Sequence, residues 1–372
     1  MLFTFIALFV ALATTLFIVR MSRGTVHTYL ATRRKNQWLR NGSLLGLGRA
    51  GGIGVAAGLL LSLLARLFDD PIIAHVDLLL LTSATPVFIA GLIEDFTQRV
   101  GIILRVSAAI ISTLLAGVLL SAWIPRVGVL WLDTALAMPV VSIFFTCFAV
   151  VGVTNAFNII DGFNGLAAGV ANLILLGIAY VAFKVGDVYI VAGALTAVGA
   201  ITGFMFLNFP RGLIYLGDGG AYLVGFWIAE LSVLLVARNP QVSAWFPVLL
   251  CSYPIFETLF TIYRRAVVRR THPGLPDVAH LHHMIYKRLI RWAVGTNLPS
   301  RRNQRNSLTS TYLWMITSVG VVPAVVFWRS TLALQLCCAC FAAAYIFGYR
   351  RIVKFHAPGW WILRNNERKE EN

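Results

Sequence analysis

The sequence predicts an all-α fold, a polytopic integral membrane helical bundle of about eleven transmembrane helices. Of the 372 residues, 58% are hydrophobic and only 12% are charged, which is too apolar for an ordinary soluble domain. Apolar runs of about 20 residues, each able to cross roughly 30 Å of hydrocarbon as a helix, recur from end to end. The predicted spans are 2–20, 44–65, 75–93, 102–122, 134–153, 165–183, 187–207, 220–237, 243–262, 311–328 and 332–349.

The first apolar run is predicted to be a span rather than a signal peptide, because it lacks a basic start and a small-residue cleavage pattern. The run 44–65 is unusually rich in glycine. All the cysteines fall inside apolar runs without metal-type spacing, so neither disulfides nor a zinc site is indicated. They are Cys147, Cys251, Cys337, Cys338 and Cys340.

The net charge of +16 is distributed unevenly along this topology. With the N-terminus outside and alternating spans, most basic residues fall on one side, which the positive-inside rule makes cytoplasmic together with the C-terminus. Since topology accounts for the charge, no nucleic-acid partner is predicted, whereas the basic surface suits a lipid bilayer with anionic headgroups. A membrane domain over 1–350, with inner connections 21–49, 94–101, 154–164, 208–219 and 263–310, precedes a basic-to-polar tail over 351–372.

Polar residues concentrate in these inner connections, which spanning alone does not require. In the second one, Glu94 and Asp95 are adjacent acids where a helix leaves the membrane. Such a pair can hold Mg²⁺ or accept a proton from a nucleophile. A solvated helix end beside Arg99 is the plainer alternative.

The third inner connection carries several amide and acid side chains with glycines between them. Asn155, Asn158, Asp161 and Asn164 fall within one short stretch between two spans. Oxygen-rich side chains on a flexible backbone suit a hard cation and phosphate groups. Helix capping explains one such residue but not all of them.

In the fourth connection, Asp218 is flanked by glycines directly before a helix. We expect Asp218 to coordinate Mg²⁺ while the helix N-terminus attracts phosphate. Tyr215 lies three residues earlier and is placed either to stack on a nucleobase or to sit in an interfacial aromatic belt.

The fifth connection contains His280, His282 and His283. No cysteine or further histidine cluster completes a tetrahedral metal site, so phosphate hydrogen bonding is the better interpretation. Two acids, Glu230 and Glu257, lie within apolar spans and are expected to face the bundle interior. For Glu257, pairing with the arginines that begin about two turns later is the plain alternative.

Taken together, these stretches resemble the polyprenyl-phosphate N-acetylhexosamine-1-phosphate transferases, of the glycosyltransferase family 4 type. The resemblance covers nearly the whole chain and rests on Asn155–Leu166, Leu216–Gly220 and His280–His283, which occur in the family's order. Gly48–Gly54 adds support. The histidine motif and Arg49 look more like the undecaprenyl-phosphate N-acetylglucosamine-1-phosphate transferase branch than the phospho-N-acetylmuramoyl-pentapeptide transferases.

This resemblance implies a magnesium-dependent site, with Mn²⁺ as an alternative metal. Asp218, with Asn158 or Asp161, would form the metal and pyrophosphate centre, and Asn164 and Tyr215 would face the uracil.

The other expected roles also follow from the resemblance. Glu94 and Asp95 stand at the family's paired aspartates, which deprotonate or position the acceptor phosphate. The histidine motif would contact phosphates, and further substrate contacts would come from Arg49, Asn155 and Arg105. Glutamate at the first acid of the pair and glycine-alanine after Asp218 depart from the family pattern.

The implied reaction transfers a hexosamine 1-phosphate from a UDP-N-acetylhexosamine to undecaprenyl phosphate, with release of UMP. It would take place at the cytoplasmic face of a bacterial inner (plasma) membrane and start a surface polysaccharide such as O-antigen. The resemblance allows a homodimer.

The sequence leaves two alternative functions. A phospho-N-acetylmuramoyl-pentapeptide transferase of peptidoglycan synthesis is the alternative within the same chemistry. A transporter or flippase is the alternative from another class, and its site should lie near mid-membrane on broken helices.

Overall fold

The computed structural model describes residues 1–32, 48–269, 280–290 and 299–354. Over these ranges the secondary structure is helical throughout, in agreement with the predicted all-α membrane bundle. The first part of the bundle consists of α1 (Leu2–Thr32), α3 (Gly51–Arg66), α4 (Pro71–Thr97), α5 (Ile102–Leu120), α6 (Leu130–Leu136), α7 (Pro139–Ile160), α8 (Leu166–Val185), α9 (Val188–Asn208) and α10 (Gly217–Arg238).

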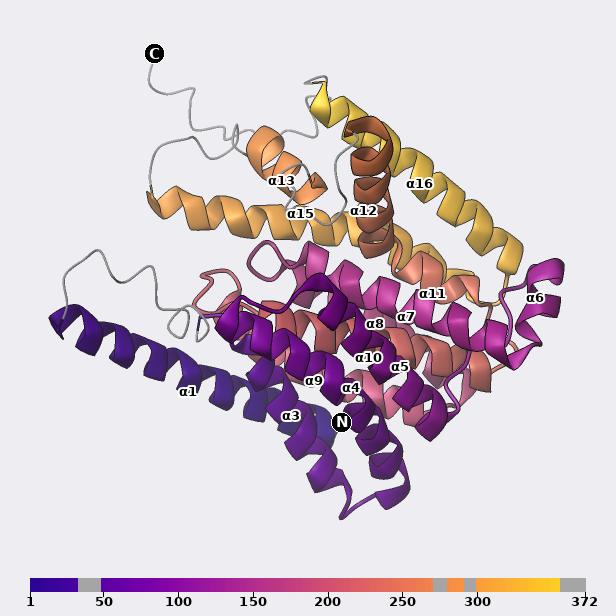
Figure 1. Cartoon of the computed structure of the whole chain (residues 1–372), viewed down its shortest axis with the longest axis horizontal. Helices are drawn as coiled ribbons and strands as arrows, with labels where there is room; N and C mark the ends of the chain where they lie inside the picture. Colours follow the sequence, from indigo (N-terminus) through magenta and orange to yellow (C-terminus); the bar gives the residue numbers. More distant parts are fainter. Residues whose placement is uncertain (33–47, 270–279, 291–298, 355–372) are drawn as a thin grey trace.

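The second part packs along one side of the first (Figure 1). It consists of α11 (Trp245–Leu250), α12 (Ser252–Tyr263), a π-helical turn η2 (Arg264–Arg269), α13 (Leu281–Ile285), a second π-helical turn η3 (Tyr286–Ile290), α15 (Pro299–Val326) and α16 (Thr331–Val353).

Within the described ranges, nine helices are long and apolar enough to cross a membrane. Two of the predicted spans are shorter than expected. The run 44–65 contributes α3, whose 16 residues extend about 24 Å, less than the roughly 30 Å of a hydrocarbon core. The run 243–262 is broken at Cys251 into α11 and α12, because Pro254 has no N–H for a continuous helical ladder.

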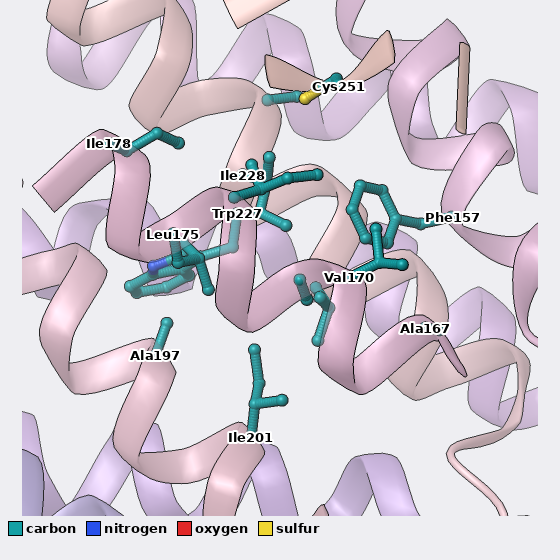
Figure 2. Packing of buried hydrophobic residues seen from close by; sticks show 14 of the residues in the cluster. Phe157, Ala167, Val170, Leu175, Ile178, Ala197, Ile201, Trp227, Ile228 and Cys251 are labelled. Carbon is teal, nitrogen blue, oxygen red and sulfur yellow. The ribbon is translucent and has the colours of Figure 1, made fainter. Parts of the chain in front are cut away.

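The central helix of the bundle is α10. Nearly every residue from Gly217 to Val236 is buried, as expected for a helix surrounded by other helices. It packs against α4, α7, α3 and α8. Figure 2 shows Trp227 between Leu175 of α8 and Ala197 of α9, and its Nε1–H donates to the Gly193 carbonyl at 3.1 Å.

Glycines let two helices approach the start of α10 very closely. A Cβ at Gly52 of α3 would lie 2.4 Å from the Gly220 nitrogen, and one at Gly91 of α4 would lie 2.6 Å from the Gly219 Cα. Small residues at helix contacts are the usual means of close packing in membrane proteins. These contacts bring the C-terminal turn of α4 beside the N-terminal turn of α10.

The opposite end of the bundle is fixed by separate polar contacts. Arg66 of α3 forms a buried ion pair with Asp77 of α4 and donates a second hydrogen bond to Thr196 of α9. Asp187 pairs with Arg238 at 2.8 Å. These pairs cross-link helices away from the loops that carry the predicted motifs.

We expect Gly91→Ala to destabilise the protein by about 1 to 3 kcal/mol, because the added methyl group overpacks the contact between α4 and α10. Thermal unfolding in detergent measures this. The matched control is Gly152→Ala in α7, where a Cβ has no neighbour within 4 Å. Equal unfolding temperatures for Gly91→Ala and Gly152→Ala would contradict the close contact.

Candidate active site

The first turn of α10 is held by a carboxylate from another helix. Asp95, in the last turn of α4, is fully buried. Its Oδ1 accepts a hydrogen bond from the Asp218 N–H at 2.8 Å, and its Oδ2 accepts one from the Gly219 N–H at 2.9 Å. The first N–H groups of a helix have no partner within the helix, so Asp95 caps α10 from outside and faces the positive end of its dipole.

A second acid approaches the same turn from the end of α7. The pKa of Asp161 is raised from 3.8 to about 7, first by burial and then by the charges of Asp218 and Asp95. The Arg49 charge and a hydrogen bond with the Gly217 N–H act in the opposite direction. Three acids from three segments therefore concentrate negative charge at the start of α10.

Two arginines offset part of this charge. Arg105 of α5 forms an ion pair with Asp218, with 2.9 Å between Nη1 and Oδ2, and both side chains remain about one-fifth exposed. Arg49 is exposed, and its backbone is anchored because the neighbouring Gly48 carbonyl accepts from the Tyr215 N–H at 2.9 Å. Both guanidinium groups are thus accessible beside the acids.

The loop after α7 is bonded to the loop before α10 and to α15. Asn208 accepts from the Gly165 N–H and donates to the Ile214 carbonyl at 2.7 Å. Asn306 of α15 accepts from the Asn164 N–H at 2.7 Å, and the Asn164 amide donates to the Pro210 carbonyl at 3.2 Å. These bonds fix the position of the loop that carries Asp161.

The histidine segment lies against that loop. The Nε2 of His282 is 3.1 Å from the place a Cβ would take at Gly162, next to Asp161. The Phe163 ring contacts the rings of His282 and His283 at 5.5 and 5.8 Å between centroids. His280 stacks on His282 with 5.1 Å between ring centroids.

The structure thus brings together Asp95, Asp161, Asp218, Arg49, Arg105 and the histidine segment. Other predicted site residues have local partners. The Asn155 amide donates to the Val151 carbonyl of its own helix, and a Glu94 carboxylate oxygen accepts from the Val100 N–H at 2.7 Å. The Asn158 carbonyl accepts from the Asp161 N–H, and Tyr215 is 53% exposed.

Two interpretations need correction. The N-terminus of α10 is not open to a phosphate, because Asp95 already accepts from its Asp218 and Gly219 N–H groups. Glu257 pairs with His280 at 2.9 Å rather than with an arginine. Arg264 instead donates to the Tyr349 hydroxyl at 2.6 Å.

Sequence reasoning missed Asn208 and Asn306. Asn208 lies at the last turn of a span just before a proline, where an amide able to bond the following loop is a recognisable signal. Asn306 lies among arginines in a long basic stretch, and no local pattern separates it from its neighbours.

The residues present fit a magnesium ion, although that metal stays a prediction. Over the described residues, no three His, Cys, Asp or Glu side chains converge as a complete ligand set. Magnesium is usually held by one or two carboxylates together with waters and substrate phosphates. Asp218 and Asp161 provide those carboxylates in a region of excess negative charge.

We expect Asp95→Asn to lower the free energy of unfolding by about 1 to 3 kcal/mol, because the amide leaves one buried N–H of α10 without an acceptor. Thermal unfolding in detergent measures the loss. Glu94→Gln is the control, since glutamine keeps an acceptor for the Val100 N–H. A wild-type unfolding temperature for Asp95→Asn would rule out the cap.

Residues 77–236 match the family described as glycosyl transferase family 4. A probable undecaprenyl-phosphate N-acetylglucosaminyl 1-phosphate transferase of Bacillus subtilis is 37% identical over 137 residues, which cover 37% of this chain and 38% of the relative. The undecaprenyl-phosphate alpha-N-acetylglucosaminyl 1-phosphate transferase of Escherichia coli K12 is 27% identical over 245 residues, 64% of each chain. A phospho-N-acetylmuramoyl-pentapeptide-transferase of Rubrobacter xylanophilus is 32% identical over 150 residues, 39% of this chain and 42% of the relative.

In each case the match spans less than two thirds of the relative's length. The family match includes Asp95, Asp161, Asp218 and Arg105, which meet at the start of α10, and ends before the histidine segment. Residues 77–236 are therefore similar to glycosyl transferase family 4, and parts of the chain are similar to undecaprenyl-phosphate N-acetylglucosaminyl 1-phosphate transferases.

Proposed function

We propose that this protein transfers an N-acetylhexosamine 1-phosphate from a UDP-sugar to undecaprenyl phosphate, and that UMP is released. The observation that carries the proposal is the meeting of Asp161 and Asp218 with Arg105 and the histidine segment at one end of a membrane bundle. Relatives named as undecaprenyl-phosphate N-acetylglucosaminyl 1-phosphate transferases support the same chemistry.

The reaction joins two polyanions, so the site has to reduce their repulsion and align them. An acceptor phosphate oxygen attacks the β-phosphorus of the donor, and the bond from that phosphorus to the oxygen bridging the α-phosphate breaks. The products are UMP and a lipid-linked sugar diphosphate.

Asp218, together with Asn158 or Asp161, would hold Mg²⁺, which supplies charge neutralisation for the pyrophosphate when bound. Arg105 and the histidines would bind phosphate oxygens. Arg49 is exposed at the same end and offers a further cation for an anionic substrate.

The acid pair need not supply a general base. The second pKa of a phosphate monoester is about 6, so the acceptor already carries the charge for attack near neutral pH. The contacts of Asp95 support a positioning role, because they fix the backbone of Asp218. Proton removal by Glu94 or Asp95 stays a prediction.

The proposed location is the cytoplasmic face of a bacterial inner membrane, with O-antigen or another surface polysaccharide as the product pathway. The excess of basic residues in the connections at the site end supports this orientation. A transporter is disfavoured because the polar cluster lies at helix ends, whereas the one carboxyl in the middle of α10, Glu230, is isolated from it.

Purified protein with undecaprenyl phosphate and Mg²⁺ should release UMP from one or more members of a panel of UDP-sugars that includes UDP-N-acetylmuramoyl pentapeptide. We expect Asp218→Asn to reduce turnover at least 100-fold, since a metal-binding carboxylate is lost. Asp69→Asn, an exposed acid at the opposite end, is the control. The proposal fails if no donor yields UMP, or if chelation of divalent metal leaves the rate unchanged.

Magnesium affinity should depend on pH through Asp161, whose pKa is raised to about 7. The metal binds the deprotonated carboxylate, so apparent affinity should rise up to about tenfold per pH unit below this pKa and level off above it. Titration with Mn²⁺ followed by electron paramagnetic resonance measures this between pH 5.5 and 8.5. In Asp161→Asn the pH dependence should disappear; persistence of the full slope there would exclude Asp161.

A further inference from the structure

Glu257 is a buried carboxyl with an unusually complete set of hydrogen bonds. It lies in α12 and is 1% exposed. Its Oε1 is 2.9 Å from the Nδ1 of His280, and its Oε2 accepts from the Tyr345 hydroxyl at 2.7 Å. The Leu281 N–H donates to both oxygens, at 3.1 and 3.3 Å. A carboxylate that is buried with several donors is stabilised in its charged form by those donors.

This arrangement determines which nitrogen of His280 carries a proton. A carboxylate offers only acceptor atoms, so Nδ1 must be the protonated nitrogen for the contact to form. The Thr261 hydroxyl lies 3.2 Å from the same nitrogen. The Nε2 of His280 is therefore the nitrogen left for a ligand, and the His280 side chain is 13% exposed.

The contact also connects the last helix to the rest of the site. Tyr345 comes from α16, while Glu257 comes from α12 and His280 from the segment leading into α13. His280 stacks on His282, whose Nε2 lies beside Gly162. One carboxylate thus fixes a chain of rings that reaches the loop holding Asp161.

We propose that Glu257 is a positioning residue: it accepts a hydrogen bond from Nδ1 of His280 and thereby turns Nε2 toward the substrate phosphates. This inference rests on the proposed function. The same pairing of a carboxylate with one imidazole nitrogen orients the other nitrogen in many histidine sites.

Glu257→Gln tests the inference, because glutamine keeps an oxygen for the His280 and Leu281 donors but removes the charge. We expect kcat to fall about tenfold while the KM for the UDP-sugar changes less than twofold, the effect of weakening one charge-assisted hydrogen bond.

Glu230→Gln is the matched control, because Glu230 is equally buried in the bundle but neither of its oxygens has a hydrogen-bond partner over the described residues. It should leave kcat and the KM for the UDP-sugar unchanged. The unfolding temperature is measured for both variants. A fall in kcat of Glu257→Gln that is matched by a lower unfolding temperature and by an equal change in KM would overturn the inference in favour of a structural role.

A double-mutant cycle tests whether Glu257 affects kcat through His280. In a His280→Asn background, which keeps a donor for Glu257 but lacks Nε2, Glu257→Gln should change kcat less than twofold. A further tenfold loss there would show that Glu257 acts independently of His280. The same assay measures UMP release by the wild-type protein, and no release of UMP would count against the proposed function. If the wild type is active and the losses of kcat in the two single variants add in the double variant, this inference alone is contradicted.

Discussion

The hydrogen bonds from the first turn of α10 to the Asp95 carboxylate are the interaction on which the rest of the site depends. They join the end of one span to the beginning of the most buried helix of the bundle. A buried carboxylate costs several kcal/mol to desolvate, and two backbone donors at a helix N-terminus offset that cost. The close approach through Gly91 and Gly219 makes this geometry attainable.

Because Asp95 is hydrogen-bonded to the start of α10, the acids near it have different roles. With Asp95 engaged by the backbone, the Asp218 side chain is left accessible beside Arg105, and Asp161 completes the concentration of charge. Glu94, adjacent in sequence to Asp95, instead bonds the Val100 N–H at the end of its own helix. The length of the Glu94 side chain is compatible with that local role.

Hydropathy predicted most of the fold, because long apolar segments must cross the bilayer as helices. It could not detect the break at Cys251 or the shortness of α3, since hydropathy measures transfer into lipid and not backbone continuity. The structure brings Asp95, Asp161 and Asp218 together from three of the predicted polar connections, yet the partners of their individual side chains could not be predicted. The residues next to Asp95 and Glu257 in the sequence do not show whether each carboxylate is solvated, paired with arginine or hydrogen-bonded to backbone.

Hydrogen–deuterium exchange of the segment around Asp218 tests the central claim most directly. Amides in the first turn of a helix normally lack a partner and exchange quickly. The Asp218 and Gly219 amides should exchange as slowly as those in the middle of α10, and Asp95→Asn should remove this protection. Fast exchange at both amides in the wild-type protein, comparable with that of an exposed loop, would contradict it.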